Sequence, residues 1–177
     1  NVIAYGGRRL SEAGPKYLNS PETEIFKKGN NLFNLHLAIE SAKKLRYIYL
    51  VEGYMDVLSL YKAGILNCVA PLGTALTDNQ ARLLRRYADK IILFFDGDDA
   101  GIRATIKAIE ICETQDVETE VVESQKGLDP DDILQKHGIN GLKKILKCPI
   151  NSFRYLLKQG FLKFNKETPK GKEEIFN

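Results

Sequence analysis

Three short acidic clusters carry the chemistry that this sequence could perform. They are Glu52-Gly-Tyr-Met-Asp56, Asp96-Gly-Asp98-Asp99 and Asp129-Pro-Asp131-Asp132, and each of the first two follows an apolar run directly. Carboxylate oxygens are the ligands that Mg²⁺ prefers, and substrate phosphates and waters usually complete its coordination. Ions held in this way can activate an attacking hydroxyl and stabilise a leaving pyrophosphate. The clusters therefore indicate metal-dependent phosphate chemistry.

Alternating strands and helices must position these clusters. Residues 47–51 and 91–95 are continuous β-rich apolar runs, the pattern of strands that are buried on both faces. Helices are expected after them at 54–63 and 100–112, shorter strands at 67–70 and 117–122, and a further helix at 77–87. This alternation predicts an α/β fold with an open, mostly parallel sheet of about four strands flanked by helices.

Glu52 and Asp96 stand directly after the two strongest strands. Because ligands of such sheets bind outside the carboxyl ends of the strands, we expect these residues and Asp98 to meet in one metal site. The alternative for Asp98 and Asp99 is that they cap the following helix, whose first turn favours negative charge. Capping does not account for Glu52 or Asp96. For Asp129, which precedes a proline, spacing leaves metal binding and capping equally open.

Smaller segments flank the predicted sheet. A short strand is expected at 2–5, a turn-rich run covers 14–21, and apolar residues at helical spacing predict an amphipathic linking helix at 32–45. Short helices are expected at 130–136, 139–146 and 150–159. We therefore expect three parts: a small N-terminal α+β segment at 1–44, the sheet domain at 45–128, and a C-terminal helical extension at 129–177 that begins with the third acidic cluster.

Composition excludes several classes of protein. The cysteines Cys68, Cys112 and Cys148 lie far apart without a CxxC pair, so neither a disulfide framework nor a zinc site is expected, and a reducing cytosolic setting fits best. No segment resembles a signal peptide or reaches the roughly 20 apolar residues that span a bilayer. The net charge of +3 does not prove nucleic-acid binding, but a surface outside the acidic clusters would be more basic than this total. The two ends of the chain resemble cuts within a larger polypeptide.

The ordered motifs resemble one family. Glu52-Gly-Tyr-Met-Asp56, Leu72-Gly-Thr74, Asp96-Gly-Asp98 and Asp129-Pro-Asp131 resemble the TOPRIM module in the version found in bacterial DNA primases. The features typical of primases lie upstream, in Tyr5-Gly-Gly-Arg8, Pro15-Lys16-Tyr-Leu-Asn19-Ser20 and Phe26-Lys-Lys28-Gly29. Together the motifs cover most of the chain from Asn1 to about His137. The resemblance implies a TOPRIM-type sheet within the RNA polymerase core of a primase.

The resemblance also implies roles for single residues. A primase makes short RNA primers on single-stranded DNA by nucleotidyl transfer, and Glu52, Asp96 and Asp98 would be its catalytic residues, holding Mg²⁺ or Mn²⁺. The supporting members of the acidic cluster would be Asp56, Asp129 and Asp131. Nucleotide phosphates would be bound by Arg8, Lys16 and Lys28, with Asn19 in the same basic loop. Arginine offers a planar fork to phosphate oxygens, and lysine a mobile point charge.

Partners and location follow from the same resemblance. It implies a bacterial cytoplasmic enzyme that does not bind a membrane. Its partners would be nucleoside triphosphates and a single-stranded DNA template. The replicative helicase would be a further partner, through a domain absent from this chain. Primases of this family also carry a zinc module that is not visible here, so we expect no zinc in this segment and reduced or no activity from it in isolation. Asp99 departs from the family, which commonly has a basic residue there.

Other TOPRIM enzymes remain alternatives. A strand-cleaving nuclease or topoisomerase would use the same acidic cluster, and a non-catalytic scaffold would keep only the fold. The basic loop with Arg8, Lys16 and Asn19 favours polymerisation, because a strand-cleaving enzyme has no evident need for it. Arg82, Arg85 and Arg86 fall on one helical face, where contact with template phosphates and plain solvation are both open.

Overall fold

The computed structural model describes residues 1–9, 17–124, 128–163, 167–168 and 173 of the 177-residue chain. A five-stranded sheet forms its centre, in the order β4-β3-β5-β6-β7. Its strands are β3 (Tyr47–Val51), β4 (Cys68–Val69), β5 (Lys90–Phe94), β6 (Glu118–Val121) and β7 (Ile150–Asn151). The first four are parallel, as the sequence predicts. β7 pairs antiparallel with β6 and was not predicted.

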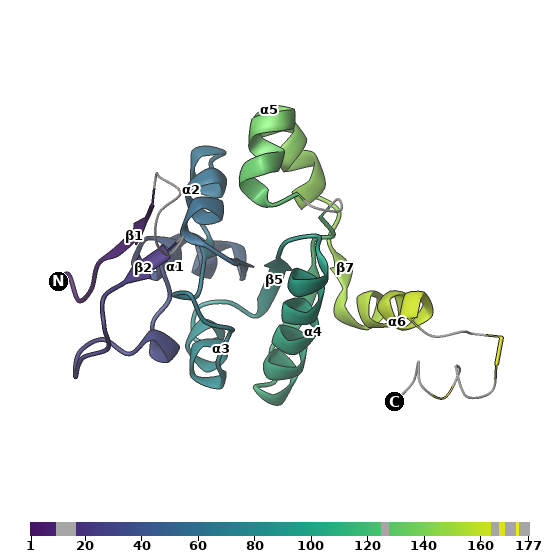
Figure 1. Ribbon diagram of the computed structural model, residues 1–177, viewed down its shortest axis with the longest axis horizontal. Helices are drawn as coiled ribbons and strands as arrows, with labels where there is room; N and C mark the ends of the chain where they lie inside the picture. The colour runs from purple at the N-terminus through teal and green to yellow at the C-terminus, as the bar shows by residue number, and fades with distance from the viewer. Residues whose placement is uncertain (10–16, 125–127, 164–166, 169–172, 174–177) are drawn as a thin grey trace.

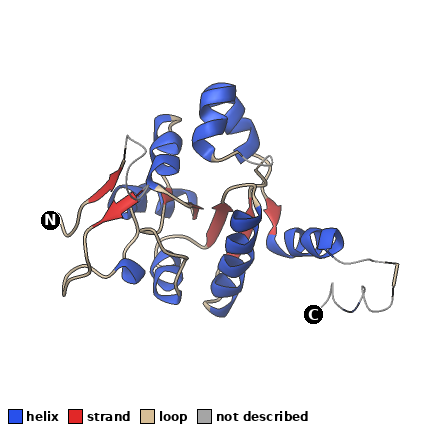
Figure 2. Ribbon diagram, in the orientation of Figure 1, coloured by secondary structure: helices blue, strands red, loops and turns tan. Residues whose placement is uncertain are grey.

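Helices cover both faces of this sheet (Figures 1 and 2). One face packs against α1 (Leu35–Leu45), α3 (Asp78–Arg85) and α4 (Asp99–Thr114), and the other against α2 (Tyr54–Lys62) and α5 (Pro130–Leu146). Side chains of β3 alternate between the two cores, with Leu50 on the first face and Val51 on the second, both fully buried. Burial on both faces is the physical reason why β3 and β5 are continuous apolar runs.

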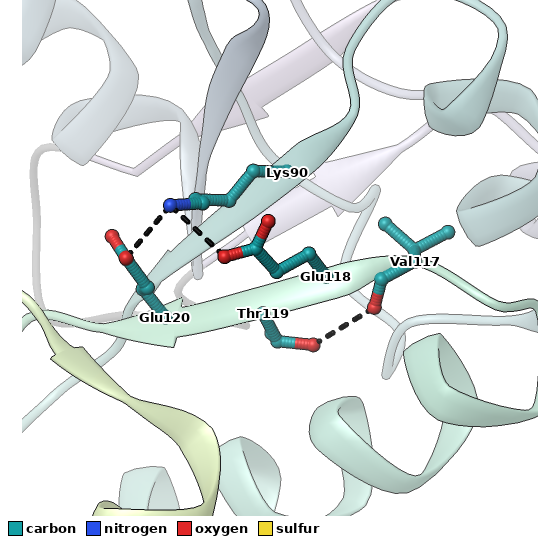
Figure 3. Close-up of polar contacts among 5 residues, drawn as sticks. All are labelled: Lys90, Val117, Glu118, Thr119 and Glu120. Carbon is teal, nitrogen blue, oxygen red and sulfur yellow. Dashed lines mark hydrogen bonds and ion pairs between the residues drawn. The ribbon is translucent and has the colours of Figure 1, made fainter.

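A cross-strand ion pair marks the amino end of β5, away from the edge where the acidic clusters stand. The Lys90 ammonium lies 3.1 Å from a Glu118 carboxylate oxygen and 2.7 Å from one of Glu120 (Figure 3). The hydrogen bond to Glu120 is the main cause that raises the pKa of Lys90. In β6 the Thr119 hydroxyl donates to the carbonyl of Val117, the residue just before this strand, at 3.3 Å. The two Lys90 contacts cross from β5 to β6 and help to hold the register of these strands.

The N-terminal segment differs from the expectation. The strand predicted at 2–5 is wrong: β1 (Gly6–Arg8) pairs antiparallel with β2 (Tyr17–Asn19) instead. The apolar residues Val2 and Tyr5 are exposed, so no core rewards a strand there. A 3-10 turn, η1 (Lys28–Asn30), follows, and α1 begins three residues later than predicted because Phe33 forms a β-bridge with Ala70.

The C-terminal part contains α5 and α6 (Ser152–Lys163). The two short helices predicted at 130–136 and 139–146 are confirmed as one element with a kink, since Gly138 interrupts the helical conformation with φ 65° and ψ −175°. The helix predicted at 150–159 was placed two residues early, because its first two residues form β7. In the part of the chain that the structure describes, no helix combines the length and apolarity of a membrane span.

Candidate metal and nucleotide site

Glu52 and Asp96 lie beside each other at the carboxyl edge of the sheet. Val51 at the end of β3 is opposite Phe94 at the end of β5, so the residues that follow the two strands are neighbours. The backbone amide of Asp96 donates a hydrogen bond to Glu52 Oε1 at 3.0 Å. The strand ends thus bring together the first two carboxylates that the sequence predicts in one site.

Asp98 stands at the start of α4 and caps it. Its Oδ1 accepts a hydrogen bond from the Gly101 amide at 2.7 Å. Gly101 itself packs directly on the backbone of Asp96: a Cβ added there would lie 2.1 Å from the Asp96 carbonyl oxygen. Only glycine permits this approach. Sequence reasoning missed this role of Gly101, although its place directly after the acidic cluster is a signal for it.

Asp56 is a buried carboxylate in the first turn of α2, with 6% of the residue exposed. Its Oδ2 accepts a hydrogen bond from the Gly53 amide at 2.9 Å. Burial raises its pKa to about 8, and the charge of Asp129 adds to this rise, as do those of Asp96 and Glu52, while the Gly53 hydrogen bond opposes it. These four carboxylates therefore share one electrostatic field.

Asp129 and Asp131 belong to the start of α5. Asp129 Oδ1 accepts from the Asp132 amide at 2.6 Å, so this residue caps α5, and its metal binding stays a prediction. A cap uses one carboxylate oxygen, and the charge of Asp129 still acts on Asp56. Asp131 accepts from the Ser59 hydroxyl at 2.7 Å and from the Gln135 amide at 2.8 Å. Asp131 thereby joins α2 to α5.

Arg8 reaches the acidic cluster through Tyr17. The two residues are opposite each other in the β1–β2 pair, and the Arg8 side chain is hydrogen-bonded to Tyr17. Burial raises the pKa of the Tyr17 hydroxyl most; the charge of Arg8 lowers it, and those of Asp56 and Asp129 raise it. A Cβ added at Gly53 would lie 3.5 Å from the Tyr17 hydroxyl. The hairpin therefore carries one arginine to the carboxylates.

Asn19 joins the same hairpin to the sheet domain. Its side chain accepts a hydrogen bond from the Tyr54 hydroxyl and donates one to the Leu72 carbonyl at 3.0 Å. The rings of Tyr17 and Tyr54 meet edge to face at 5.7 Å. A small cleft opens here, lined by Tyr17, Asn19, Glu52, Gly53, Tyr54, Pro71 and Gly73. The two tyrosines are site residues that sequence reasoning missed, although each lies within or beside a recognised motif.

The structure describes one of the two predicted lysines. Lys28 lies in η1, where its amide donates to Glu22 at 2.9 Å and its carbonyl accepts from Gln80 of α3 at 2.9 Å. The structure thus anchors this loop to α3 through its backbone. Lys16 falls outside the described residues.

Two family models match the chain. Residues 1–39 match the N-terminal domain of the DNA primase catalytic core, and residues 49–134 match a Toprim-like domain. The chain belongs to the bacterial, DnaG-type DNA primase family. The DNA primase of Aquifex aeolicus is 45% identical over 89% of this chain and 32% of its own length. The DNA primase of Borreliella burgdorferi is 44% identical over 93% of this chain and 32% of its own. The chain thus spans about a third of these relatives.

Solved primase structures share the fold. A DNA primase domain from Pseudomonas aeruginosa matches with a TM-score of 0.88 and 35% identity over 98% of this chain and 56% of that one. The Aquifex aeolicus primase, with its zinc-binding and RNA polymerase domains, matches with a TM-score of 0.85 and 42% identity over 98% of this chain and 42% of that one. A DnaG catalytic domain bound to single-stranded DNA matches with a TM-score of 0.85 and 34% identity over 98% and 57%. These likenesses agree with the predicted TOPRIM-type α/β fold.

The primase carboxylates fit a hard divalent cation by their chemistry. Within the described ranges, no three His, Cys, Asp or Glu side chains stand close enough together to hold an ion as they are. Four of the carboxylates accept hydrogen bonds from backbone amides instead, those of Glu52, Asp56, Asp98 and Asp129. The cluster still supplies only oxygen donors, and the repulsion felt by Asp56 is what a bound cation would relieve.

Proposed function

We propose that this chain is part of the RNA-polymerising core of a primase, which makes short primers on single-stranded DNA by metal-dependent nucleotidyl transfer. One observation carries the proposal. The carboxylates at the sheet edge and Arg8 from the N-terminal hairpin meet through Tyr17, so cation-binding and phosphate-binding groups face one site. Relatives named DNA primase and a primase domain bound to single-stranded DNA support it.

In this proposal Glu52, Asp96 and Asp98 hold Mg²⁺ or Mn²⁺. Asp56, Asp129 and Asp131 add negative charge behind them. The ions would neutralise the triphosphate and stabilise the pyrophosphate that leaves. No zinc is required, because the site offers only oxygen donors and zinc in proteins is usually held by sulfur and nitrogen.

The chain's own residues bind the nucleotide and move one proton. Arg8 would hold phosphate oxygens with its planar fork, and Lys16 and Lys28 would add mobile charges. Asn19 would form the wall of the cleft and hold Tyr54 in place. The attacking 3′-hydroxyl oxygen bonds to the α-phosphorus as the bond to pyrophosphate breaks. Glu52 is the candidate that accepts the hydroxyl proton.

The proposal extends to organisation and partners. We assign 1–44 to the nucleotide-contacting segment, 45–128 to the TOPRIM domain and 129–177 to the third acidic motif with its helical extension. Nucleoside triphosphates and a single-stranded template are the ligands, and the replicative helicase is reached through a domain outside this chain. The setting is the bacterial cytoplasm. Asp99 adds a negative charge to the first turn of α4, where the resemblance implies a basic residue.

Primer synthesis tests the proposal. A full-length primase that carries this sequence should extend nucleoside triphosphates into RNA on a single-stranded template with Mg²⁺ or Mn²⁺. Glu52→Gln should lower the rate by a factor on the order of 10² or more, because it removes a metal ligand and the candidate base. Glu113→Gln, at an exposed position of α4, is the matched control and should keep the rate.

The same assay separates polymerisation from strand cleavage. A labelled template strand is followed in parallel with the RNA product. Cleavage of the template without RNA synthesis, lost on Glu52→Gln, would replace the proposal with a TOPRIM nuclease. Full primer synthesis by Glu52→Gln would contradict the assignment of this residue.

A further inference from the structure

A groove between η1 and α3 offers positive charge that the acidic site does not use. It is lined by Asn30, Asn79, Arg82, Leu83 and Arg86. The groove begins at the turn that contains Lys28 and continues along α3, which lies beside α4 (Figure 1). Its two walls come from segments about 50 residues apart in the chain, and they are fixed to each other by hydrogen bonds.

The junction of the two walls is built from buried contacts. Gln80, which is fully buried, donates to the carbonyl oxygens of Lys28 at 2.9 Å and Asn31 at 2.7 Å. The Thr77 hydroxyl donates to the Gly29 carbonyl at 2.5 Å. On the surface above them Asn79 donates to Asn30 at 2.9 Å. The groove therefore has a defined shape before any ligand arrives.

The three arginines of α3 are not equivalent. Arg85 is paired with Asp116 at 2.8 Å. Arg82 is held by the neutral amide oxygens of Gln115 at 3.2 Å and Asn79 at 3.4 Å, and no carboxylate within 4.0 Å neutralises it in the described chain. Arg86 is exposed, and the described residues give its side chain neither a hydrogen bond nor an ion pair. Two of the three charges in this region are thus uncompensated and line the groove.

The surroundings keep that charge available. The nearest acidic residue on the same helix, Asp78, accepts from Gln115 at 3.1 Å and from Thr114 at 3.4 Å instead of pairing with Arg82. Arg82 and Arg86 line the groove together with Asn30 of η1 and form its basic track.

We propose that this track binds the phosphodiester backbone of a single-stranded nucleic acid, the strand that enters or leaves the acidic site. Successive phosphates along a strand match a row of separated positive groups, and arginine forks and neutral amides are the groups that contact phosphate and sugar. Lys28, in η1 beside the groove, is one of the residues that the proposed function assigns to nucleotide phosphates. In this last respect the inference rests on the proposed function.

Oligonucleotide binding by the whole chain tests the inference. The probe is a fluorescently labelled single-stranded DNA, and its anisotropy is followed at several salt concentrations. The double variant Arg82→Gln/Arg86→Gln should bind roughly tenfold more weakly, and the slope of log affinity against log salt should fall by about 1.4, because two phosphate contacts are lost. Arg82→Lys/Arg86→Lys should keep most of the affinity.

Arg85→Gln/Lys107→Gln is the matched control, since it removes two positive charges that Asp116 and Glu110 already neutralise. It should change affinity by less than about twofold. The inference is wrong if both double variants lower the affinity for single-stranded DNA equally, or if Arg82→Gln/Arg86→Gln leaves this affinity unchanged. It is also wrong if the wild type does not bind the probe. The same titrations are repeated with a duplex DNA probe. If Arg82→Gln/Arg86→Gln weakens binding of the duplex only, the single-strand assignment is wrong.

A second measurement keeps the two proposals apart. Mn²⁺-dependent nucleotide binding should be unchanged in Arg82→Gln/Arg86→Gln, whereas Asp96→Asn should lose nucleotide binding and keep binding of the oligonucleotide. If the wild type binds the oligonucleotide but shows no Mn²⁺-dependent nucleotide binding, the proposed function fails and the groove remains a nucleic-acid contact. Circular dichroism shows whether each variant is folded.

Discussion

Asp56 is the residue at which the acidic edge acts most directly on the stability of the fold. It is buried in the first turn of α2, and burial together with Asp129, Asp96 and Glu52 raises its pKa to about 8. In the unfolded chain its pKa returns to an ordinary value near 4. The folded protein therefore binds one more proton than the unfolded chain between about pH 4 and pH 8.

The sign of the pH dependence follows from this difference. Stability is highest below the unfolded pKa and falls as the pH rises toward the folded pKa. In EDTA, the wild type should lose on the order of 4 kcal/mol more free energy of unfolding between pH 5 and pH 8 than Asp56→Asn. Urea unfolding at the two pH values measures this. Asp89→Asn, at an exposed position, should behave as the wild type. If the free energy of unfolding changes equally between the two pH values in all three proteins, the raised pKa of Asp56 is wrong.

At the scale of single residues, the sequence predicts where the carboxylates lie in the fold but not which side chains they contact. Glu52 and Asp96 follow two strongly apolar strands, so their meeting at one sheet edge could be predicted. The bond between Ser59 and Asp131 could not, because the two residues lie 72 positions apart and depend on the docking of α5 on α2. The contact of Tyr17 with Arg8 could not be predicted either, because it depends on the pairing of β1 with β2.

At the scale of elements, the docking of α4 on the loop after β5 positions the second acidic cluster. Gly101 makes this contact possible, since any side chain would meet the Asp96 backbone. Gly101→Ala should lower the free energy of unfolding by about 1–3 kcal/mol through overpacking and should also weaken Mn²⁺ binding, because the loop must move. Denaturant unfolding and metal titration measure the two effects.

Gly7→Ala is the control for this substitution, since a Cβ there meets nothing within 4 Å. It should leave both quantities close to those of the wild type. Equal behaviour of the two alanine variants would show that α4 does not fix the loop.

Long elements were predictable and short ones were not. The strands at 47–51 and 91–95 and the helices after them carry strong patterns because the sheet is covered on both faces. β1 and β7 have three and two residues, and their pairing partners define them more than their own composition does. The strand expected at 2–5 is wrong for that reason: the partner β2 lies opposite Gly6–Arg8.

At the scale of the whole molecule, charge is divided between two regions. The carboxylates gather at the carboxyl edge of the sheet near the hairpin arginine Arg8, while Arg82 and Arg86 of α3 line a separate groove beside η1. A net charge of +3 hides this separation. Only the fold shows which basic residues are neutralised, as Arg85 is, and which are not.

The central claim is that the carboxylate edge binds a divalent cation together with a nucleotide. Isothermal titration of the chain with a nucleoside triphosphate, with and without Mn²⁺, tests it most directly on the wild type, on Asp96→Asn and on the distant control Asp89→Asn. The account predicts Mn²⁺-dependent binding by the wild type and the control, and a loss of roughly tenfold or more for Asp96→Asn. Equal affinity of the wild type and Asp96→Asn would contradict it.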